Sequence, residues 1–297
     1  MPDAVDHRNR LERQLLRSAS FKRFRSIQRL GQDRSGHASV EHVRHQLYVG
    51  RDKATNADAL IKVTTKPRLV YEQSLTNEIA TLSTINRELP DSRYFPLLLD
   101  HGRLSDGRVF LIMSLFAEWP LATTIGPERM PDRLVVHLRT ALEVATALTD
   151  LHRIPVFHVD LNPMNILYRF EKGRPVIRVV DFESSYEVAR HAKGVFYNPP
   201  TTAGFCAPEV HDRAPDRRVD VFSLGAVLYT IVAGYDWTWH PELSASIEAN
   251  AELDGDLKTI LLMATKLDAD KRYQTIQDMS APLAAYLESI WPGRSWV

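Results

Sequence analysis

The sequence predicts an α+β fold in two parts, a smaller part built mainly of strands and a larger part built of helices. Up to Phe116 the apolar residues come in short runs bounded by polar stretches, which is typical of strands. Beyond Phe116 they recur every three or four residues, which is typical of amphipathic helices. With 297 residues, 44% of them hydrophobic, the chain can form one domain or two closely joined lobes.

The smaller part begins with a predicted hairpin, because the apolar runs 47–49 and 59–63 are separated by a polar stretch. A helix is predicted over 71–87, and two further strands over 95–99 and 109–116. The residues that define the apolar stripe of the helix are Leu75, Ile79, Leu82 and Ile85. We therefore expect a part that is mostly sheet and contains one helix.

The larger part has four segments with a helical pattern. The first ends near His152, and the last two cover 257–267 and 276–290. Between them, the segment 221–232 is apolar almost all round, which predicts a helix buried in the middle of this part.

The domain organisation that we expect has three pieces: a basic N-terminal extension at 1–25, the smaller part at 26–116 and the larger part at 117–297. The extension has leucines at weak helical spacing among many arginines. It is either a solvated helix or loose arm, or a docking segment for an acidic partner, and both interpretations stay open.

The charge balance excludes some classes of protein. Lys plus Arg and Asp plus Glu number 37 each, so no overall field favours nucleic acid or an anionic membrane. Cys206 is the only cysteine, which excludes an internal disulfide and fits a reducing compartment. The longest strongly apolar run, 224–234, is shorter than the roughly 20 residues that span a bilayer. We expect a cytoplasmic protein with no membrane span and no nucleic-acid partner.

A loop near the middle of the chain carries side chains suited to phosphoryl transfer. Asp160 is followed by Asn165, and Asp181 comes after a further apolar run. Transfer from ATP needs a carboxylate to orient the accepting hydroxyl, an amide for one Mg²⁺, and a second carboxylate for the metal that bridges the phosphates. The three side chains occur in that order, which predicts a phosphotransferase site.

The loop 158–167 and the triplet Asp181-Phe182-Glu183 resemble the catalytic loop and the metal-binding motif of the eukaryotic-type (Hanks-type) serine/threonine protein kinases. The likeness covers roughly residues 27–290. Later segments resemble the end of the activation segment, the start of the central helix of the large lobe, and a late segment with a structural arginine: 201–209, 220–225 and 267–273. The chain is identified as a divergent member of this family, with a two-lobed fold.

Lys62 and Glu78 are expected to form an ion pair. Lys62 ends a strand-like run, and Glu78 lies on or beside the apolar face of the predicted helix. A carboxylate on that face needs a partner, because an unpaired buried charge is costly. The resemblance implies that Lys62 grips the ATP phosphates and that Glu78 holds Lys62.

The resemblance also assigns roles in the catalytic loop and the metal site. Asp160 would orient the substrate hydroxyl, and Asn162 stands where a lysine usually helps to neutralise the transferred phosphate. Asn165 and Asp181 would bind the metal. Glu183 replaces a glycine and is either a further metal ligand or a residue that faces solvent.

The resemblance implies ATP with Mg²⁺ or Mn²⁺ as cofactors, a protein substrate, and a regulatory protein partner. The hinge that holds adenine would offer backbone groups of Ser114, Leu115 and Phe116, and Met113 would guard the back of the adenine pocket. Thr202 matches a threonine of the serine/threonine kinases. Asp220 would accept backbone hydrogen bonds from the catalytic loop, and Glu209 and Arg272 would form an internal ion pair.

Two further features depart from the family pattern. The glycine-rich loop is absent: it falls near 40–46 without any glycine, or it starts earlier and includes Gly31 and Gly36. His42, Arg44 and His45 in this stretch either contact phosphate or are solvated. Val159 replaces an arginine that usually pairs with a phosphate on the activation segment, so we expect that route of switching to be missing.

Four functions stay open at this point. The favoured one is an active protein kinase that acts on serine or threonine. A pseudokinase that binds and regulates is the alternative, because the glycines are missing. A small-molecule kinase is a second alternative, and adenylylation of protein hydroxyls is a third.

Overall fold

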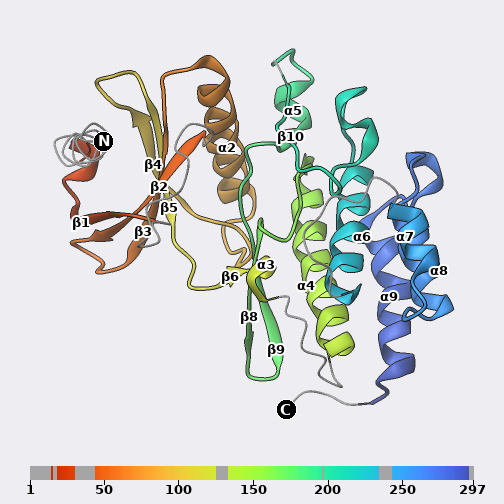
Figure 1. Cartoon of the computed structure of the whole chain (residues 1–297). Helices are drawn as coiled ribbons and strands as arrows, with labels where there is room; N and C mark the ends of the chain where they lie inside the picture. The colour runs from red at the N-terminus through yellow and green to blue at the C-terminus, as the bar shows by residue number, and fades with distance from the viewer. Residues whose placement is uncertain are drawn as a thin grey trace, which may run out of the picture. The chain divides into compact units, whose positions relative to one another are not determined.

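The computed structural model describes residues 15, 19–30, 44–124, 133–195, 197–233 and 243–293. The chain divides into two compact units, which we describe separately (Figure 1). Unit 1 consists of Met1–Asn86 and Pro96–Phe116, and unit 2 consists of Arg87–Phe95 and Ala117–Val297. The stretches predicted to hold the glycine-rich loop, Gly31 and Gly36 among them, fall largely outside the described residues.

Unit 1 contains an antiparallel five-stranded sheet in the order β1-β2-β3-β5-β4. Its elements are η1 (Ala19–Phe21), β1 (Phe24–Arg29), β2 (His45–Asp52), β3 (Asp58–Thr64), α2 (Leu69–Glu88), β4 (Leu98–Arg103) and β5 (Val109–Ser114). The predicted hairpin is confirmed as β2 and β3. The predicted helix is confirmed as α2, and all four residues of its apolar stripe are buried.

One strand of unit 1 was placed wrongly by its apolar pattern. The sequence predicts a strand over 95–99, but β4 begins only at Leu98. Phe95 instead belongs to unit 2, where its ring lies edge-on to Phe182 with the ring centroids 5.8 Å apart. Phe95, at the start of the apolar run, therefore packs within unit 2, and only Leu98 and Leu99 at its end belong to a strand.

The core of unit 1 includes residues from the segment expected to be an extension. Leu15, Phe21 and Phe24 are all buried, and the centroids of the Phe21 and Phe110 rings lie 4.8 Å apart. A side chain at Gly50 would not fit this core, because a Cβ there would lie 2.8 Å from the Phe24 ring. Part of the segment 1–25 is thus packed against the sheet.

Unit 2 is mainly helical and has two small sheets, β10-β7 and β6-β8-β9. Its strands are β6 (Trp119–Pro120), β7 (Val156–Phe157), β8 (Ile166–Glu171), β9 (Arg174–Val179) and β10 (Tyr186–Glu187). Its helices are α3 (Leu121–Thr124), α4 (Arg133–Arg153), α5 (Val188–His191), η2 (Pro208–His211), α6 (Arg218–Ala233), α7 (Leu243–Ala249), α8 (Gly255–Ala264), η3 (Ala269–Lys271) and α9 (Ile276–Ile290).

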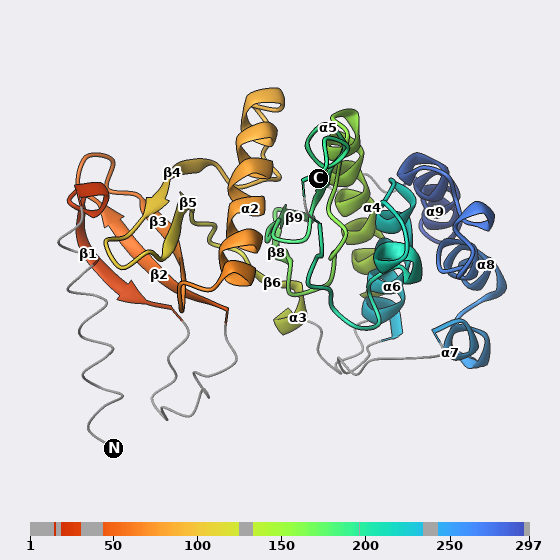
Figure 2. The same cartoon turned by 90° about the horizontal axis from the view of Figure 1, so that it is seen from above.

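The centre of unit 2 is α6, which lies side by side with α4 and α9 (Figures 1 and 2). Most residues of α6 are buried, so the prediction of a central buried helix is confirmed. At Gly225 the helix passes so close to α8 that a Cβ would lie 2.8 Å from the Cβ of Ala264. Across the described part of the chain, none of the helices combines the length and the apolar character needed to cross a bilayer.

Candidate active site

The ion pair between Lys62 and Glu78 is present in unit 1. Lys62 lies in β3, and its Nζ is 2.8 Å from Oε2 of Glu78 on α2. Glu78 is fully buried and Lys62 is 7% exposed, so the pairing predicted from the helix pattern is confirmed. Because both charges are removed from water, loss of either partner would leave an uncompensated buried charge at a cost of about 3–5 kcal/mol.

The segment predicted to form the adenine hinge follows the end of β5. Met113 is buried and lies opposite Leu98 of β4. The Ser114 N–H donates to the carbonyl of Leu97, and its Oγ accepts from the Leu97 N–H, both at 2.9 Å. The backbone N–H and the hydroxyl of Ser114 are therefore both hydrogen-bonded to Leu97.

Asp220, at the start of α6, holds the beginning of the catalytic loop in unit 2. Its carboxylate accepts the backbone N–H groups of His158 at 2.9 Å and Val159 at 2.8 Å, and Nε2 of His152 lies 2.8 Å from it. Burial alone would raise the pKa of Asp220, but these hydrogen bonds and the nearby His side chains leave it lowered. The predicted backbone hydrogen bonds to Asp220 are thus confirmed.

These bonds fix Val159 in an unusual backbone conformation. Its φ is +72°, in the left-handed region that β-branched residues rarely adopt. Such strain persists only when the surroundings over-determine it, and here two successive N–H groups share one carboxylate. The conformation sets the direction in which the chain enters Asp160.

Asp160 is held by the end of the activation segment. The Thr202 N–H donates to one carboxylate oxygen at 2.6 Å, and the Thr202 hydroxyl donates to the other at 3.2 Å. Burial, the largest effect, raises the pKa of Asp160 to about 6, while the Thr202 hydrogen bonds lower it and the charge of Asp181 raises it further. The result is a carboxylate that titrates close to neutral pH.

Asn162 links the catalytic loop to Thr202 through hydrogen bonds of its side-chain amide. Its Nδ2 donates to the Asp160 carbonyl and to the Thr202 hydroxyl, both at 3.0 Å. Its Oδ1 accepts the N–H of Met164 at 2.9 Å, and the side chain is 3% exposed. Both hydrogens of the amide are therefore used inside unit 2.

Asn165 and Asp181 are linked through the backbone. The Val180 N–H donates to the Asn165 carbonyl at 2.9 Å, next to Asp181, whose φ of +66° is left-handed. The amide nitrogen of Asn165 donates to the Asp160 carbonyl at 2.9 Å, which leaves its Oδ1 without a partner among the described residues. This oxygen and a carboxylate are the ligand types that Mg²⁺ prefers.

Glu183 is buried, with 8% of its surface exposed. The interpretation that Glu183 faces solvent is therefore wrong. The preceding Phe182 is fully buried and packs against His158, with the ring centroids 5.0 Å apart. Packing of Phe182 thus anchors the triplet beside the catalytic loop.

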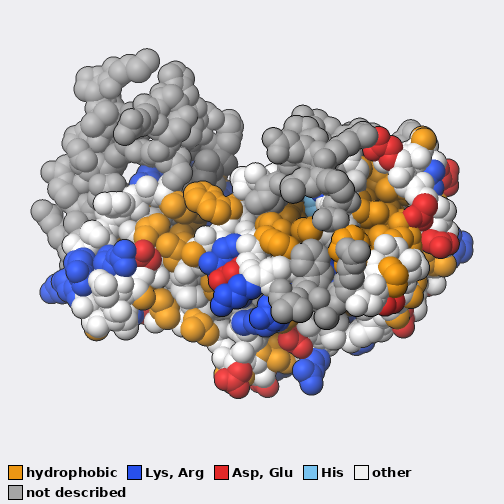
Figure 3. Space-filling model, turned by 90° about the horizontal axis from the view of Figure 1, so that it is seen from below, with side chains coloured by type: hydrophobic (Ala, Val, Ile, Leu, Met, Phe, Trp, Pro, Cys, Tyr) orange, Lys and Arg blue, Asp and Glu red, His pale blue; other side chains and the backbone are white. Residues whose placement is uncertain are grey.

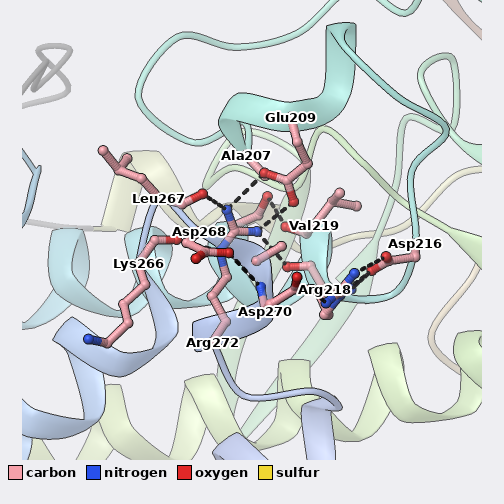
Figure 4. A network of polar contacts seen from close by, with 12 residues as sticks. Ala207, Glu209, Asp216, Arg218, Val219, Lys266, Leu267, Asp268, Asp270 and Arg272 are labelled. Atoms are coloured by element: carbon pink, nitrogen blue, oxygen red, sulfur yellow. Dashed lines mark hydrogen bonds and ion pairs between the residues drawn. The ribbon is translucent and has the colours of Figure 1, made fainter.

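The predicted ion pair between Glu209 and Arg272 is confirmed (Figure 4). Two guanidinium nitrogens of Arg272 meet the two carboxylate oxygens at 2.7 and 2.8 Å. Arg272 also donates to three backbone carbonyls, those of Arg218, Lys266 and Leu267. This hub ties the end of the activation segment to the start of α6 and to η3.

An aromatic cluster that was not predicted from the sequence holds the start of the activation segment. Tyr186 stacks on His191 with centroids 4.7 Å apart, and Tyr197 meets both rings edge-on. The Tyr197 hydroxyl donates to the Ser184 carbonyl at 2.7 Å. Val159 belongs to the buried cluster that Tyr197 packs against. The replacement of an arginine by Val159 was the available signal, because an apolar residue there requires apolar neighbours.

Comparison with known families matches residues 46–292 to the protein kinase domain. The chain therefore belongs to the protein kinase family, whose members generally use ATP and Mg²⁺.

Among similar proteins is the ribosomal protein S6 kinase alpha-2 of Homo sapiens, which is 33% identical over 189 residues, or 62% of this chain and 24% of that protein. The ribosomal protein S6 kinase 2 beta of Xenopus laevis is 47% identical over 87 residues, or 29% of this chain and 14% of that protein. The ribosomal protein S6 kinase alpha-1 of Rattus norvegicus is 45% identical over 87 residues. The match thus spans about a quarter of these relatives at most.

Proposed function

We propose that this chain is an active protein kinase that transfers the γ-phosphoryl group of ATP to serine or threonine hydroxyls of a protein substrate. The observation that carries the proposal is the contact between Asp160 and Thr202, in which both carboxylate oxygens are engaged. An inert scaffold has no need for a buried carboxylate oriented in this way. Thr202 is also the residue that resembles the threonine of the serine/threonine kinases.

Asp160 orients the substrate hydroxyl and accepts its proton. With a pKa of about 6 the carboxylate is mostly ionised at pH 7 and is still a better proton acceptor than an ordinary aspartate. Its orientation is fixed before substrate arrives, because the Thr202 hydrogen bonds hold both oxygens. Preorganisation of this kind lowers the cost of reaching the transition state.

Asn162 acts as a positioning residue in this proposal. Its two amide hydrogens are used by the Asp160 carbonyl and the Thr202 hydroxyl, so none is left to donate to the transferred phosphate. Its contribution is to keep Asp160 and Thr202 together. The positive charge that this chain itself would supply to the phosphate is that of Lys62.

Lys62, held by Glu78, would bind the phosphates of ATP, and Asn165, Asp181 and Glu183 would hold the metal. Mg²⁺, or Mn²⁺ in its place, neutralises the charge that develops during transfer when it is bound. For the adenine hinge we propose the backbone of Leu115 and Phe116 with Met113 behind it. Ser114 contributes less than the sequence suggests, because its N–H is bonded to Leu97.

The regulatory protein partner stays a prediction, as do the boundaries 1–25, 26–116 and 117–297. Support for a kinase that needs no phosphate on its activation segment comes from Tyr197 and Val159. Apolar packing and the Tyr197 hydrogen bond hold the segment where an arginine and a phosphate would otherwise do so.

The test is intact-mass measurement after incubation with Mg²⁺, ATP and a generic protein substrate. The wild type is expected to add the mass of a phosphoryl group, and Asp160→Asn should add none while it still binds ATP. A mass gain the size of AMP would move the assignment to adenylylation. No gain from the wild type on a panel of serine, threonine and small-molecule acceptors would favour the pseudokinase.

A further inference from the structure

Unit 2 has a hollow of about 600 Å³ beside the β8–β9 hairpin. Its walls come from α4, from the hairpin, from Arg93, and from Leu287 of α9. Two acidic residues, Glu143 and Glu171, line it. Six basic residues line it: Arg93, Arg139, Arg169, Lys172, Arg174 and Arg178. A chain whose formal net charge is 0 therefore concentrates positive charge at this place.

The acidic neighbours neutralise only part of this charge. Arg93 lies 2.7 Å from Glu143, and Arg169 lies 2.8 Å from Glu171. Arg178 is 3.3 Å from Glu118, which is buried outside the lining. With six basic and two acidic lining residues the hollow carries +4, and +3 when Glu118 is included.

The turn of the hairpin carries positive charge that these acidic neighbours do not neutralise. Lys172 and Arg174 are exposed, and neither has an ion pair within the described ranges. Figure 3 shows Lys and Arg side chains gathered near the middle of the face seen from below, with a few acidic ones among them. Figure 1 shows the hairpin turn at the lower end of β8 and β9 in unit 2. An anion can approach from this side.

The hollow also has apolar walls. Leu142, Val176 and Leu287 line it and are only half-buried, so part of each side chain faces the open space. A small polyanion would gain nothing from these surfaces. A peptide in which acidic and apolar side chains alternate would contact both kinds of wall.

The hollow is separate from the candidate active site. Asn165 immediately precedes β8, and Lys172 immediately follows it. Six strand residues at about 3.3 Å each put the hairpin turn roughly 20 Å from Asn165 along the strand. A ligand at the turn therefore leaves the catalytic loop open.

We propose that this hollow is a docking site for an acidic peptide segment of a partner or substrate protein, in which carboxylates or phosphates pair with the basic rim and apolar side chains cover the interior wall. The site would select which protein reaches the kinase without taking part in transfer. It is independent of the proposed activity, because even an inert scaffold could use it.

The test uses fluorescence anisotropy at physiological salt with a labelled DNA duplex and three labelled peptides of equal length. One alternates glutamate and leucine, one carries phosphoserine in place of glutamate, and one carries lysine instead. The protein variants are Lys172→Gln/Arg174→Gln and, as a matched control for charge, Lys266→Gln/Lys271→Gln, two exposed lysines of unit 2 that do not line the hollow.

The acidic or the phosphorylated peptide is expected to bind saturably, and the lysine peptide not to bind. The hairpin variant should weaken binding by about tenfold or more, which corresponds to about 1.4 kcal/mol, while the control should bind like the wild type. Which anionic peptide binds better identifies carboxylate or phosphate as the preferred group.

Three results would overturn the proposal. These are no saturable binding of either anionic peptide, equal weakening in the hairpin variant and the control, and tighter binding of duplex DNA with the same dependence on Lys172 and Arg174. Phosphoryl transfer to a short generic substrate serves as the independent readout, and it should be unchanged in the hairpin variant.

Discussion

Arg272 should be much costlier to remove than its partner Glu209. The Arg272 side chain is fully buried, bonds both oxygens of Glu209, and donates to three carbonyls. Its guanidinium also lies 4.9 Å from the centre of the Phe222 ring. Arg272→Met would leave a carboxylate and these carbonyls without their donor, and we expect a loss of about 3–5 kcal/mol in the free energy of unfolding.

Glu209→Gln should cost less, about 1–2 kcal/mol, because the change keeps the shape and one acceptor oxygen. Arg272 then retains its contacts to the carbonyls of Arg218, Lys266 and Leu267. Lys271→Ala is the control, since its side chain is 70% exposed and its ion pair in the described part of the chain is with Asp268 at 3.2 Å. It should change stability by less than about 0.5 kcal/mol.

The assay is urea denaturation followed by far-UV circular dichroism, with hydrogen exchange of peptides from α6 and α9 as a readout specific to unit 2. The expected order of loss is Arg272→Met, then Glu209→Gln, then Lys271→Ala. If Glu209→Gln were as damaging as Arg272→Met, the energy would lie in the ion pair and the carbonyl contacts would contribute nothing.

Three further outcomes are expected. Because the pKa of Asp160 rises from 3.8 to about 6 on folding, the contribution of Asp160 to the free energy of unfolding should fall as pH rises through that range. The wild type should therefore lose stability relative to Asp160→Asn over that interval, and parallel plots of unfolding free energy against pH would refute the pKa shift. Because the Thr202 hydroxyl lowers the pKa of Asp160, Thr202→Val should move the midpoint of the pH profile of kcat/KM upwards, and an unmoved midpoint would remove the hydroxyl from the argument. Gly50→Ala should cost about 1–3 kcal/mol in a denaturation experiment, because its Cβ would lie 2.8 Å from Phe24, whereas Gly255→Ala, with nothing within 4 Å, should be neutral or stabilising.

The sequence predicted those parts of the fold in which the pattern of apolar residues is compatible with only one kind of secondary structure. The stripe of α2 and the all-round apolar α6 could only be buried helices, and Glu78 on the stripe required a cation such as Lys62. The start of β4 was missed because Phe95 is apolar for a different reason, its packing against Phe182. An apolar run does not reveal which surface it will cover.

The candidate site was predictable in its residue types but not in its connections. The order of Asp160, Asn165 and Asp181 indicated phosphoryl transfer. The sequence around Asn162 does not indicate that its two amide hydrogens bond to the Asp160 carbonyl and the Thr202 hydroxyl. The contact with Thr202 joins residues 40 positions apart in the chain, so it depends on the path of the activation segment. The basic hollow was missed for the same reason, because its arginines come from separate elements.

The contact between Thr202 and Asp160 links the position of the activation segment thermodynamically to the binding of a proton by Asp160. When the segment is in place, the hydrogen bonds from Thr202 favour the ionised carboxylate. If the segment moved away, Asp160 would lose these donors, and this loss by itself would raise the pKa of the carboxyl group. Reciprocity then requires that protonation of Asp160 loosens the segment to the same extent. In a kinase with Val159 in place of the phosphate-binding arginine, the contact between Thr202 and Asp160 would make the position of the activation segment depend on pH.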